Sequence, residues 1–364
     1  MIAIDYSKAF DSVSHSTIFK VFETFGFGGK IINWIKTLYN NGRSCVMNND
    51  FKSEYFSIER SCRQGDNLSP YCFILVLEIL LNVLRFDENI QGIKIVNRVG
   101  ENGTEREVKL SSFADDCTYF LRNKDSIGHL LQHINNFSLI SGLEINRSKS
   151  ECLYIGGEID PGENILGIHL VENLKILGYY FGHSRLICEY QNFFSRLVKI
   201  EKLFNIWKQR TLTIFGKNLI VNSLATSLVI FPAHVDHPPE AFLRELKKLI
   251  KNFLWSSNNP KIAHSAAISD WKNGGFKFRD LDNFLEGLKI KFLTKLNFYE
   301  PNSWMLLPIR WICDSIGCPV NYDILTCNFN LPSERNMKGN PFYSSALKTY
   351  KKITDHKITM SDEL

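Results

Sequence analysis

Residues 111–120 contain two adjacent aspartates, Asp115 and Asp116, between short runs of β-branched and aromatic residues. The pattern predicts two strands joined at a tight turn that carries both carboxylates. Neighbouring carboxylates repel each other and stay ionised at little cost only beside a cation. Mg²⁺ suits such a place, because it binds one or two carboxylates, keeps several waters and completes its shell with substrate phosphates. A solvated Asp-Asp turn is the simpler alternative for this motif taken alone.

The composition is that of a globular protein of two or three domains. Of the 364 residues, 44% are hydrophobic and 13% aromatic, which is ample material for separate cores. Nine scattered cysteines, an odd number without a framework spacing, indicate reduced thiols. The group Cys313, Cys318 and Cys327 suggests a zinc site, but no well-spaced fourth ligand accompanies it. We expect a nuclear or cytoplasmic protein without a signal peptide or a transmembrane segment.

The basic residues are concentrated in one internal block. Residues 196–295 contain 17 Lys and Arg against 8 Asp and Glu, whereas the rest of the chain has 26 basic and 30 acidic residues. Such a block fits a surface that contacts a phosphate backbone, and it equally fits a solvated helical face. The most apolar run, residues 73–84, is short and is interrupted by Glu78 and Asn82, so it predicts a buried helix and no membrane span.

The order of the predicted elements is that of an α+β domain, with an antiparallel sheet covered by helices on one face, followed by a helical region. A strand at residues 1–5 ends on Asp5, and a core strand at the first residue suggests a truncated chain. Ser69 is the predicted N-cap, and Pro70 the first residue, of the helix that follows. Further helices are predicted at residues 18–25, 31–38, 127–140, 189–231, 240–255 and 284–298, and paired strands or hairpins at 44–47 with 55–58, 152–155 and 174–181.

Asp5 ends one strand, and Asp115 and Asp116 lie at the turn of a hairpin. Adjacent strands of one sheet would bring the three carboxylates together. Phosphoryl transfer with two metal ions needs this arrangement, because positioning and charge neutralisation supply most of its rate.

Five short motifs occur in the order of the palm motifs of reverse transcriptases. They are Asp5 to Phe10-Asp11, Arg63-Gln64-Gly65 to Leu68-Ser69-Pro70, Phe113-Ala114-Asp115-Asp116, Gly142-Leu143-Glu144-Ile145-Asn146 with Lys149, and Leu177-Gly178. Over residues 1–182 the chain most resembles the non-LTR retrotransposon (long interspersed element) branch. The block 192–296 is similar to the thumb and post-thumb regions of such elements, less specifically, through Trp255, Lys261, Gly274 and Gly275.

This resemblance implies three domains. A ferredoxin-like polymerase palm would occupy residues 1–182, with the fingers largely missing. A helical thumb would occupy residues 183–256, and a post-thumb region of uncertain fold residues 257–364.

The resemblance also implies roles for the acidic residues and for one lysine. Asp5, Asp115 and Asp116 would bind two Mg²⁺ ions, or Mn²⁺ in their place. Lys149 would neutralise or protonate the leaving pyrophosphate, although a solvated lysine is an equal alternative.

The remaining matched residues would contact the nucleotide or the nucleic acid. Phe10 would block a ribose 2′-OH, or would pack in the core. Gln64 and Gly65 would line the nucleotide site, where glycine allows close backbone approach, and Arg63 would pair with phosphate or hold its loop. The primer grip would comprise Leu177 and Gly178, and phosphate contacts in the thumb would come from Lys208, Arg210 and Lys217.

An RNA-directed DNA polymerase is therefore implied, acting on an RNA template, a DNA primer and deoxynucleoside triphosphates, with no membrane partner. Asp66-Asn67 departs from the usual small or Pro-containing pair, and no fingers precede Asp5, so we expect weak or no activity from this chain alone. The alternative is a catalytically silent remnant that at most binds nucleic acid through its basic helical region. A nucleotidyl cyclase on a similar palm is disfavoured by the loop 63–65 and the basic thumb.

Overall fold

Strand β1 (Ile2–Ile4) lies inside a six-stranded sheet of the computed structural model, with the order β11-β12-β10-β1-β9-β8. It pairs antiparallel with β9 (Asp116–Tyr119) on one side and with β10 (Glu151–Cys152) on the other. Ile2 and Ile4 are buried and Ala3 is less so, because successive side chains of a strand point to opposite faces. Among the described strands of this sheet, β10 and β12 are the one pair that runs parallel.

The chain divides into two units, which are described separately. Unit 1 comprises residues 1–94 and 107–183, and unit 2 comprises residues 95–106 and 184–364. The structure describes residues 1–97, 104–156, 164–256, 261–296, 302–316 and 341–361.

Unit 1 contains the sheet, five helices and several short hairpins among its described residues. The helices are α1 (Ala9–Ser12), α2 (His15–Thr24), α3 (Gly29–Tyr39), α4 (Ser69–Phe86) and α5 (Lys124–Ser141). The remaining strands of unit 1 are β2 (Arg43–Ser44), β3 (Met47–Asn48), β4 (Phe51–Lys52), β5 (Phe56–Ser57), β8 (Leu110–Phe113), β11 (Asn164–Ile165), β12 (Ile168–Leu170), β13 (Asn173–Ile176) and β14 (Tyr179–Gly182). The paired strands β6 (Ile93–Asn97) and β7 (Thr104–Val108) have residues in both units.

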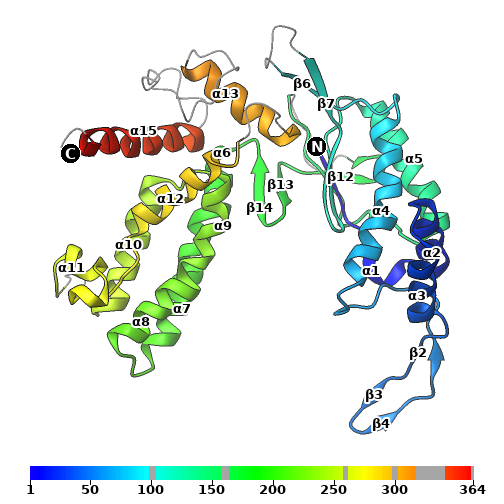
Figure 1. Ribbon diagram of the computed structural model, residues 1–364, viewed down its shortest axis with the longest axis horizontal. Helices are drawn as coiled ribbons and strands as arrows, with labels where there is room; N and C mark the ends of the chain where they lie inside the picture. Colours follow the sequence, from blue (N-terminus) through cyan, green and yellow to red (C-terminus); the bar gives the residue numbers. More distant parts are fainter. Residues whose placement is uncertain (98–103, 157–163, 257–260, 297–301, 317–340, 362–364) are drawn as a thin grey trace. The chain divides into compact units, whose positions relative to one another are not determined.

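Helices α4 and α5 cover one face of the sheet (Figure 1). Apolar residues of α4 such as Phe73, Val76 and Leu80 are buried in one core with Ile2 and Ile4. This confirms the predicted antiparallel sheet with helices on one face. Helix α5 ends at Gly142, whose φ of 80° is accessible to glycine at little cost, as its position after the last apolar residue predicts.

Two local predictions in unit 1 need correction. The N-cap of α4 is Leu68 and not Ser69, which is the first helical residue. Ser69 is buried, and its hydroxyl lies 3.3 Å from the hydroxyl of Tyr39, so this contact replaces capping. The strand predicted at 152–155 is also shorter, since β10 ends at Cys152.

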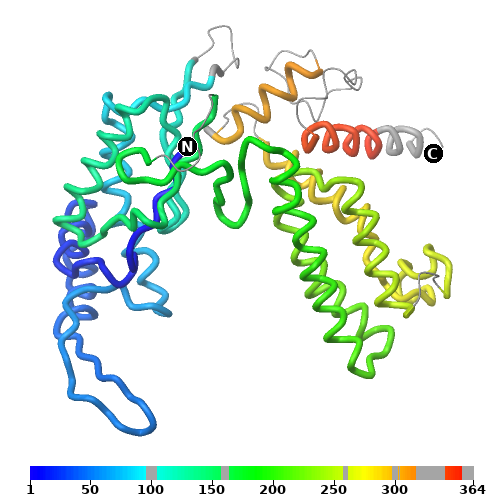
Figure 2. Tube along the Cα trace, turned by 180° about the vertical axis from the view of Figure 1, so that it is seen from behind, coloured from blue at the N-terminus to red at the C-terminus, as the bar shows by residue number. Residues whose placement is uncertain are grey.

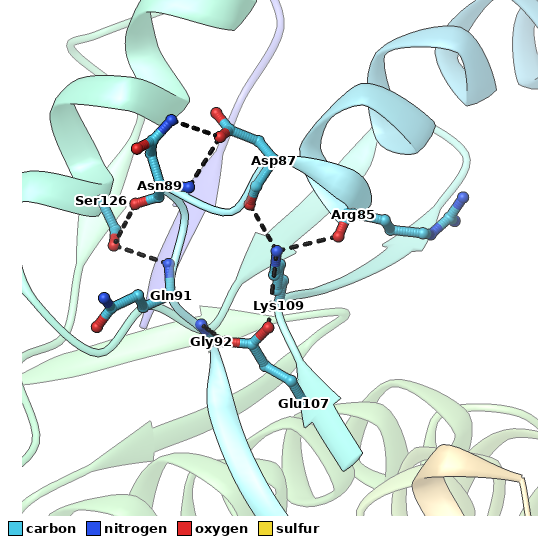
Figure 3. A network of polar contacts seen from close by, with 8 residues as sticks. All are labelled: Arg85, Asp87, Asn89, Gln91, Gly92, Glu107, Lys109 and Ser126. Carbon is cyan, nitrogen blue, oxygen red and sulfur yellow. Dashed lines mark hydrogen bonds and ion pairs between the residues drawn. The ribbon is translucent and has the colours of Figure 1, made fainter. Parts of the chain in front are cut away.

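A largely covered lysine, Lys109, joins the end of α4 to the segment that leads into the aspartate pair (Figure 3). The side chain of Lys109 is 10% exposed and donates to the carbonyls of Arg85 (3.0 Å) and Asp87 (2.7 Å). It also lies 3.6 Å from a carboxylate oxygen of Glu107, whose other oxygen accepts from Gly92 N–H at 2.7 Å. These bonds satisfy carbonyls that the helix end leaves unpaired, and they fix the start of β8.

Unit 2 is helical in most of its described residues. Its helices are α6 (Arg185–Glu189), α7 (Ser195–Lys208), α8 (Ile214–Ile220), α9 (Ser227–Val235), α10 (Glu240–Trp255), α11 (His264–Ile268), α12 (Leu281–Leu293), α13 (Leu306–Ile316) and α15 (Pro341–Ser361), with π-helical turns η1 (Tyr190–Phe194) and η2 (Val221–Ala225) and 3₁₀ turns η3 (Trp271–Asn273) and η4 (Ser303–Met305). Helices α7 and α10 lie side by side (Figures 1 and 2) and share a core that includes Phe204, Phe242 and Phe253. Helix α12 adds Leu281 and Leu285 to it, so residues beyond 256 pack with the predicted thumb.

The C-terminal helices differ from the prediction. The helix expected at 284–298 begins earlier and ends at Leu293, and its last two predicted residues lie outside the described part of the chain. Helices α13 and α15 follow, where no helix was predicted. They form a further core with the end of α12, through Ile309, Ile312 and Leu347 among others.

Two helical stretches, Ser69–Phe86 and Ile214–Val235, are long and apolar enough to cross a membrane, contrary to the sequence expectation. Both contribute to protein cores: the first through Phe73 and Leu77, the second through Val221 and Val229. Length and composition alone therefore do not distinguish these helices from membrane spans.

Candidate active site

The strand register sets the acidic residues next to one another. Strands β1 and β9 pair Ile2 with Tyr119 and Ile4 with Cys117, so the next step of the register places Asp5 opposite Asp116. Asp115 lies in the two-residue turn between β8 and β9, after Ala114 at a φ of 53°. The predicted hairpin is therefore confirmed.

The turn at residues 146–150 is attached to the end of β1 by the backbone of Asp5. The carbonyl of Asp5 accepts from Asn146 N–H at 2.8 Å, and its N–H donates to the hydroxyl of Ser150 at 3.1 Å. Ser150 is fully buried and also donates to the carbonyl of Asn146 at 2.8 Å. Lys149 lies in this turn, so the turn fixes the backbone position of Lys149 relative to Asp5.

These segments enclose a cavity of about 530 Å³ in unit 1. Its lining includes Asp5 and Asp115 from the acidic group, Lys149 from the turn, and Phe10 and Gln64. Five residues from four predicted motifs, separated by up to 144 positions in the chain, thus line one space. Asp11 and Lys8 line it as well, so the cavity has three carboxylates and two cations, and it can hold a divalent ion together with an anionic ligand.

The three carboxylates influence one another electrostatically. Partial burial raises the pKa of Asp116, and the charges of Asp115 and Asp5 raise it further. In the described residues, no three His, Cys, Asp or Glu side chains are arranged to hold one metal ion. Mg²⁺ needs only one or two carboxylates besides substrate phosphates, and the predicted ligands Asp5 and Asp115 both line the cavity, as does Asp11, whose carboxylate accepts from Gln64. Asp116 does not line the cavity, and its ligand role stays a prediction.

Phe10 and Gln64 line the same cavity in different ways. One ring face of Phe10 stacks on Phe73, with centroids 4.5 Å apart and an interplanar angle of 16°. Phe10 thus combines the two alternatives considered for it, core packing and a place at the site. The amide of Gln64 donates to the carboxylate of Asp11 at 3.4 Å, which directs both groups toward the cavity.

The side chain of Arg63 contacts other parts of the protein, and Gly65 lies in a turn that needs glycine. The guanidinium of Arg63 donates to the carbonyl of Leu38 at 2.9 Å and lies 5.9 Å from the centroid of the Tyr39 ring. Of its two proposed roles, this geometry favours holding the loop. Gly65 has a φ of 86° and open space where a Cβ would lie, so the turn itself requires glycine here.

Leu177 and Gly178 form the two-residue turn of the β13–β14 hairpin. Their φ angles of 47° and 85° are those of a type I′ turn, so the turn geometry favours glycine at position 178. Leu177 is 49% exposed at the hairpin tip.

The three cations predicted for the thumb separate into two kinds. Lys208 ends α7 and Arg210 follows it, and both are exposed. Lys217 donates to the carbonyl of Leu254 and to the hydroxyl of Ser256, at 3.3 Å each, and so completes the end of α10. Internal contacts therefore occupy Lys217.

Sequence reasoning gave no role to Asp11, Asn146 or Ser150, although all three help to build the site. The polar turn 146–150 was the only available signal. Unit 2 has its own cavity of about 360 Å³, lined by Trp255, Phe278 and others, and no predicted site residue lines it. Cys313 is buried in a helical core, and Cys318 and Cys327 lie outside the described residues.

Comparison with known proteins places this site in a family. Residues 1–181 match the family described as Reverse transcriptase (RNA-dependent DNA polymerase). The chain is 31% identical over 183 residues to the Retrovirus-related Pol polyprotein from type-2 retrotransposable element R2DM of Drosophila melanogaster, which covers 50% of this chain and 16% of that protein. It is 24% identical over 260 residues to the Transposon TX1 uncharacterized 149 kDa protein of Xenopus laevis, which covers 70% and 19%.

A telomerase structure from Candida tropicalis, in complex with a fragment of telomeric RNA, is similar at a TM-score of 0.38 and 13% identity, over 84% of this chain and 48% of that one. The sequence matches decide the family. The chain spans less than a fifth of the length of the two curated relatives named above, at 16% and 19%. Residues 1–181, which contain the cavity and its carboxylates, belong to the reverse transcriptase family in its non-LTR retrotransposon branch.

Proposed function

We propose that this chain contributes the palm of an RNA-directed DNA polymerase, in which the cavity of unit 1 holds the incoming deoxynucleoside triphosphate. The single observation that carries the proposal is that Asp5, which follows β1, and Asp115, in the β8–β9 turn, line one cavity with Lys149. In the reaction, a primer 3′-oxygen would bond to the α-phosphorus while the bond to the β-phosphate oxygen breaks and pyrophosphate leaves. Template, primer and triphosphates are partners by this proposal.

Asp5 and Asp115 would hold Mg²⁺, with Mn²⁺ as a substitute. When bound, such ions acidify the attacking hydroxyl and neutralise the triphosphate. The two carboxylates supply negative charge on one side of the cavity, and Lys149 supplies positive charge that suits a leaving pyrophosphate. The strand pairing and the turn 146–150 hold these groups in place before substrate binds, which lowers the entropy lost on the way to the transition state.

Phe10 and Gln64 would define the sugar and base side of the site. The ring of Phe10 is fixed by Phe73 and fits a steric barrier to a 2′-hydroxyl. Gln64 is oriented by Asp11, so its amide can donate to the nucleotide. Leu177 and Gly178 at their hairpin tip would contact the primer backbone, and Lys208 and Arg210 its phosphates.

Primer extension tests the proposal. The full chain is incubated with an RNA template, a DNA primer, deoxynucleoside triphosphates and Mg²⁺, beside its Asp115→Ala and Asp125→Ala variants. Loss of one metal carboxylate should lower extension at least about 1,000-fold. Asp125 is exposed on the first turn of α5, away from the cavity, and its replacement should leave extension near that of the parent chain.

Two results would argue against this function. If primer extension survives Asp115→Ala, the cavity is not where the reaction takes place. Template binding without any extension by the parent chain would support the alternative, a silent remnant that binds nucleic acid through the basic residues of unit 2.

A further inference from the structure

Five aromatic rings form a continuous series in unit 2, which we term the aromatic ladder. The centroid of Trp255 is 5.9 Å from that of Phe278, Phe278 is 5.8 Å from Phe276, Phe276 is 5.5 Å from Phe215, and Phe215 is 6.4 Å from Trp271. Trp255 and Phe278 pack against the unit 2 core. At the other end, Phe215 is 52% exposed and Trp271 is 63% exposed. The core therefore anchors two large rings at the surface.

The segment that carries Trp271 is ordered by its own backbone bonds. Gly275 N–H donates to the carbonyl of Asp270 at 3.1 Å, and Lys277 N–H donates to the carbonyl of Ser269 at 2.9 Å. A Cβ at Gly275 would lie 2.0 Å from the Ser269 oxygen, so only glycine allows this approach. These contacts fix the backbone that carries Trp271 at the surface, where its side chain is 63% exposed.

Cations accompany the exposed end of the ladder. Lys277 Nζ lies 5.8 Å from the centroid of the Trp271 ring and 3.3 Å from the Asp270 carboxylate. Lys272 follows Trp271 directly and is exposed. Exposed rings beside cations are the combination that binds single strands, because bases stack on the rings while phosphates meet the cations. A protein partner suits this surface less well, since it would have to bury the charges of both lysines.

We propose that Phe215 and Trp271 form a stacking platform for unpaired bases of a single-stranded nucleic acid, with Lys272 and Lys277 beside the adjacent phosphates. A duplex offers free base faces only at its ends, so the platform selects single strands. The platform lies in unit 2 and needs no catalysis by the cavity of unit 1, so it can hold or fail separately from the proposed polymerase function.

Binding without divalent ions tests the platform. The full chain is titrated against a labelled single strand of about 15 nucleotides, as RNA and as DNA, and against a blunt duplex of that length, with anisotropy as the readout. Trp271→Ala should weaken single-strand binding about tenfold and leave duplex binding unchanged. Trp34→Ala is the matched control, because Trp34 is 67% exposed on α3 of unit 1 and should not affect either.

Salt dependence separates stacking from charge. Lys272→Gln should reduce the slope of log K against log salt by about 0.7, whereas Trp271→Ala should leave the slope unchanged. If Trp271→Ala fails to melt cooperatively, Trp271→Phe and Trp271→Leu replace it, with binding retained by Phe and weakened by Leu. Undiminished single-strand affinity in Trp271→Ala, or an equal loss on the duplex, would overturn the proposal.

Discussion

At the scale of single residues, Phe10 is the clearest case of one side chain in two environments. One ring face rests on the buried Phe73, and the residue also lines the cavity beside Asp5. Stacking on Phe73 restricts the ring to one orientation, because a shift of either ring would disturb a close-packed core. A ring held in this way can exclude a hydroxyl that a mobile ring would accommodate.

We therefore expect Phe10→Val to relax the choice between deoxyribonucleotides and ribonucleotides by at least about tenfold in kcat/KM ratio. Single-nucleotide extension with either triphosphate measures this ratio. Phe73→Leu is the comparison, because it removes the ring that holds Phe10 but leaves the Phe10 ring at the cavity, so the ratio should relax less than in Phe10→Val. Equal relaxation in both variants would mean that packing, and not the Phe10 ring itself, sets the preference.

Arg63 and Lys217 show where residue-level prediction from sequence stops. Both were considered for phosphate contact, and each side chain instead donates to a carbonyl distant in the chain, Arg63 to Leu38 and Lys217 to Leu254. The neighbouring residues in the sequence do not tell a cation that donates to carbonyls at a helix end from a cation that binds phosphate. Only the fold distinguishes them.

At the scale of elements, the turn between β8 and β9 was predictable because its causes are local. The alternation of residues 110–119 and the polar pair between them specify a hairpin, and the structure has one. The attachment of the turn 146–150 to β1 was not predictable, since Asp5 and Ser150 are 145 positions apart. Helix α13 was missed because it carries Pro308, which a helix tolerates in its first turn.

Ser150→Ala tests whether that attachment positions the site. The change leaves the Asp5 N–H without its partner, and we expect the free energy of unfolding to fall by about 1–2 kcal/mol. Extension should fall with it, because Lys149 is no longer held beside Asp5. Chemical denaturation and primer extension give the two readouts. Ser57→Ala, at an exposed serine of β5 that does not line the cavity, should change neither, and equal effects of both variants would contradict a specific role for Ser150.

At the scale of the whole molecule, the two units have cores of different origin. Unit 1 buries one face of a sheet against helices, and unit 2 buries helices against one another. His237 lies in unit 2 between α9 and α10, and its Nδ1 is buried without a hydrogen-bond partner among the described residues. Burial lowers the pKa of His237 to about 4, and the charge of Lys289 acts in the same direction. Unit 2 therefore folds around a neutral imidazole.

Because the pKa of His237 is lowered in the folded chain, the stability of unit 2 decreases with falling pH already above the range in which carboxylates titrate. Between pH 6.5 and about 4, the unfolded chain binds a proton at His237 that the folded chain does not, so stability falls as the pH falls through that window. His237→Leu removes the proton uptake and the unpaired nitrogen together. We expect the melting temperature of this variant to fall less between pH 7.5 and 5 than that of the parent chain. His234→Leu, at an exposed histidine on α9, should retain the full pH dependence. If His237→Leu instead parallels the parent chain across this interval, the acid sensitivity arises elsewhere, with the carboxylates near Lys289 as the next groups to replace.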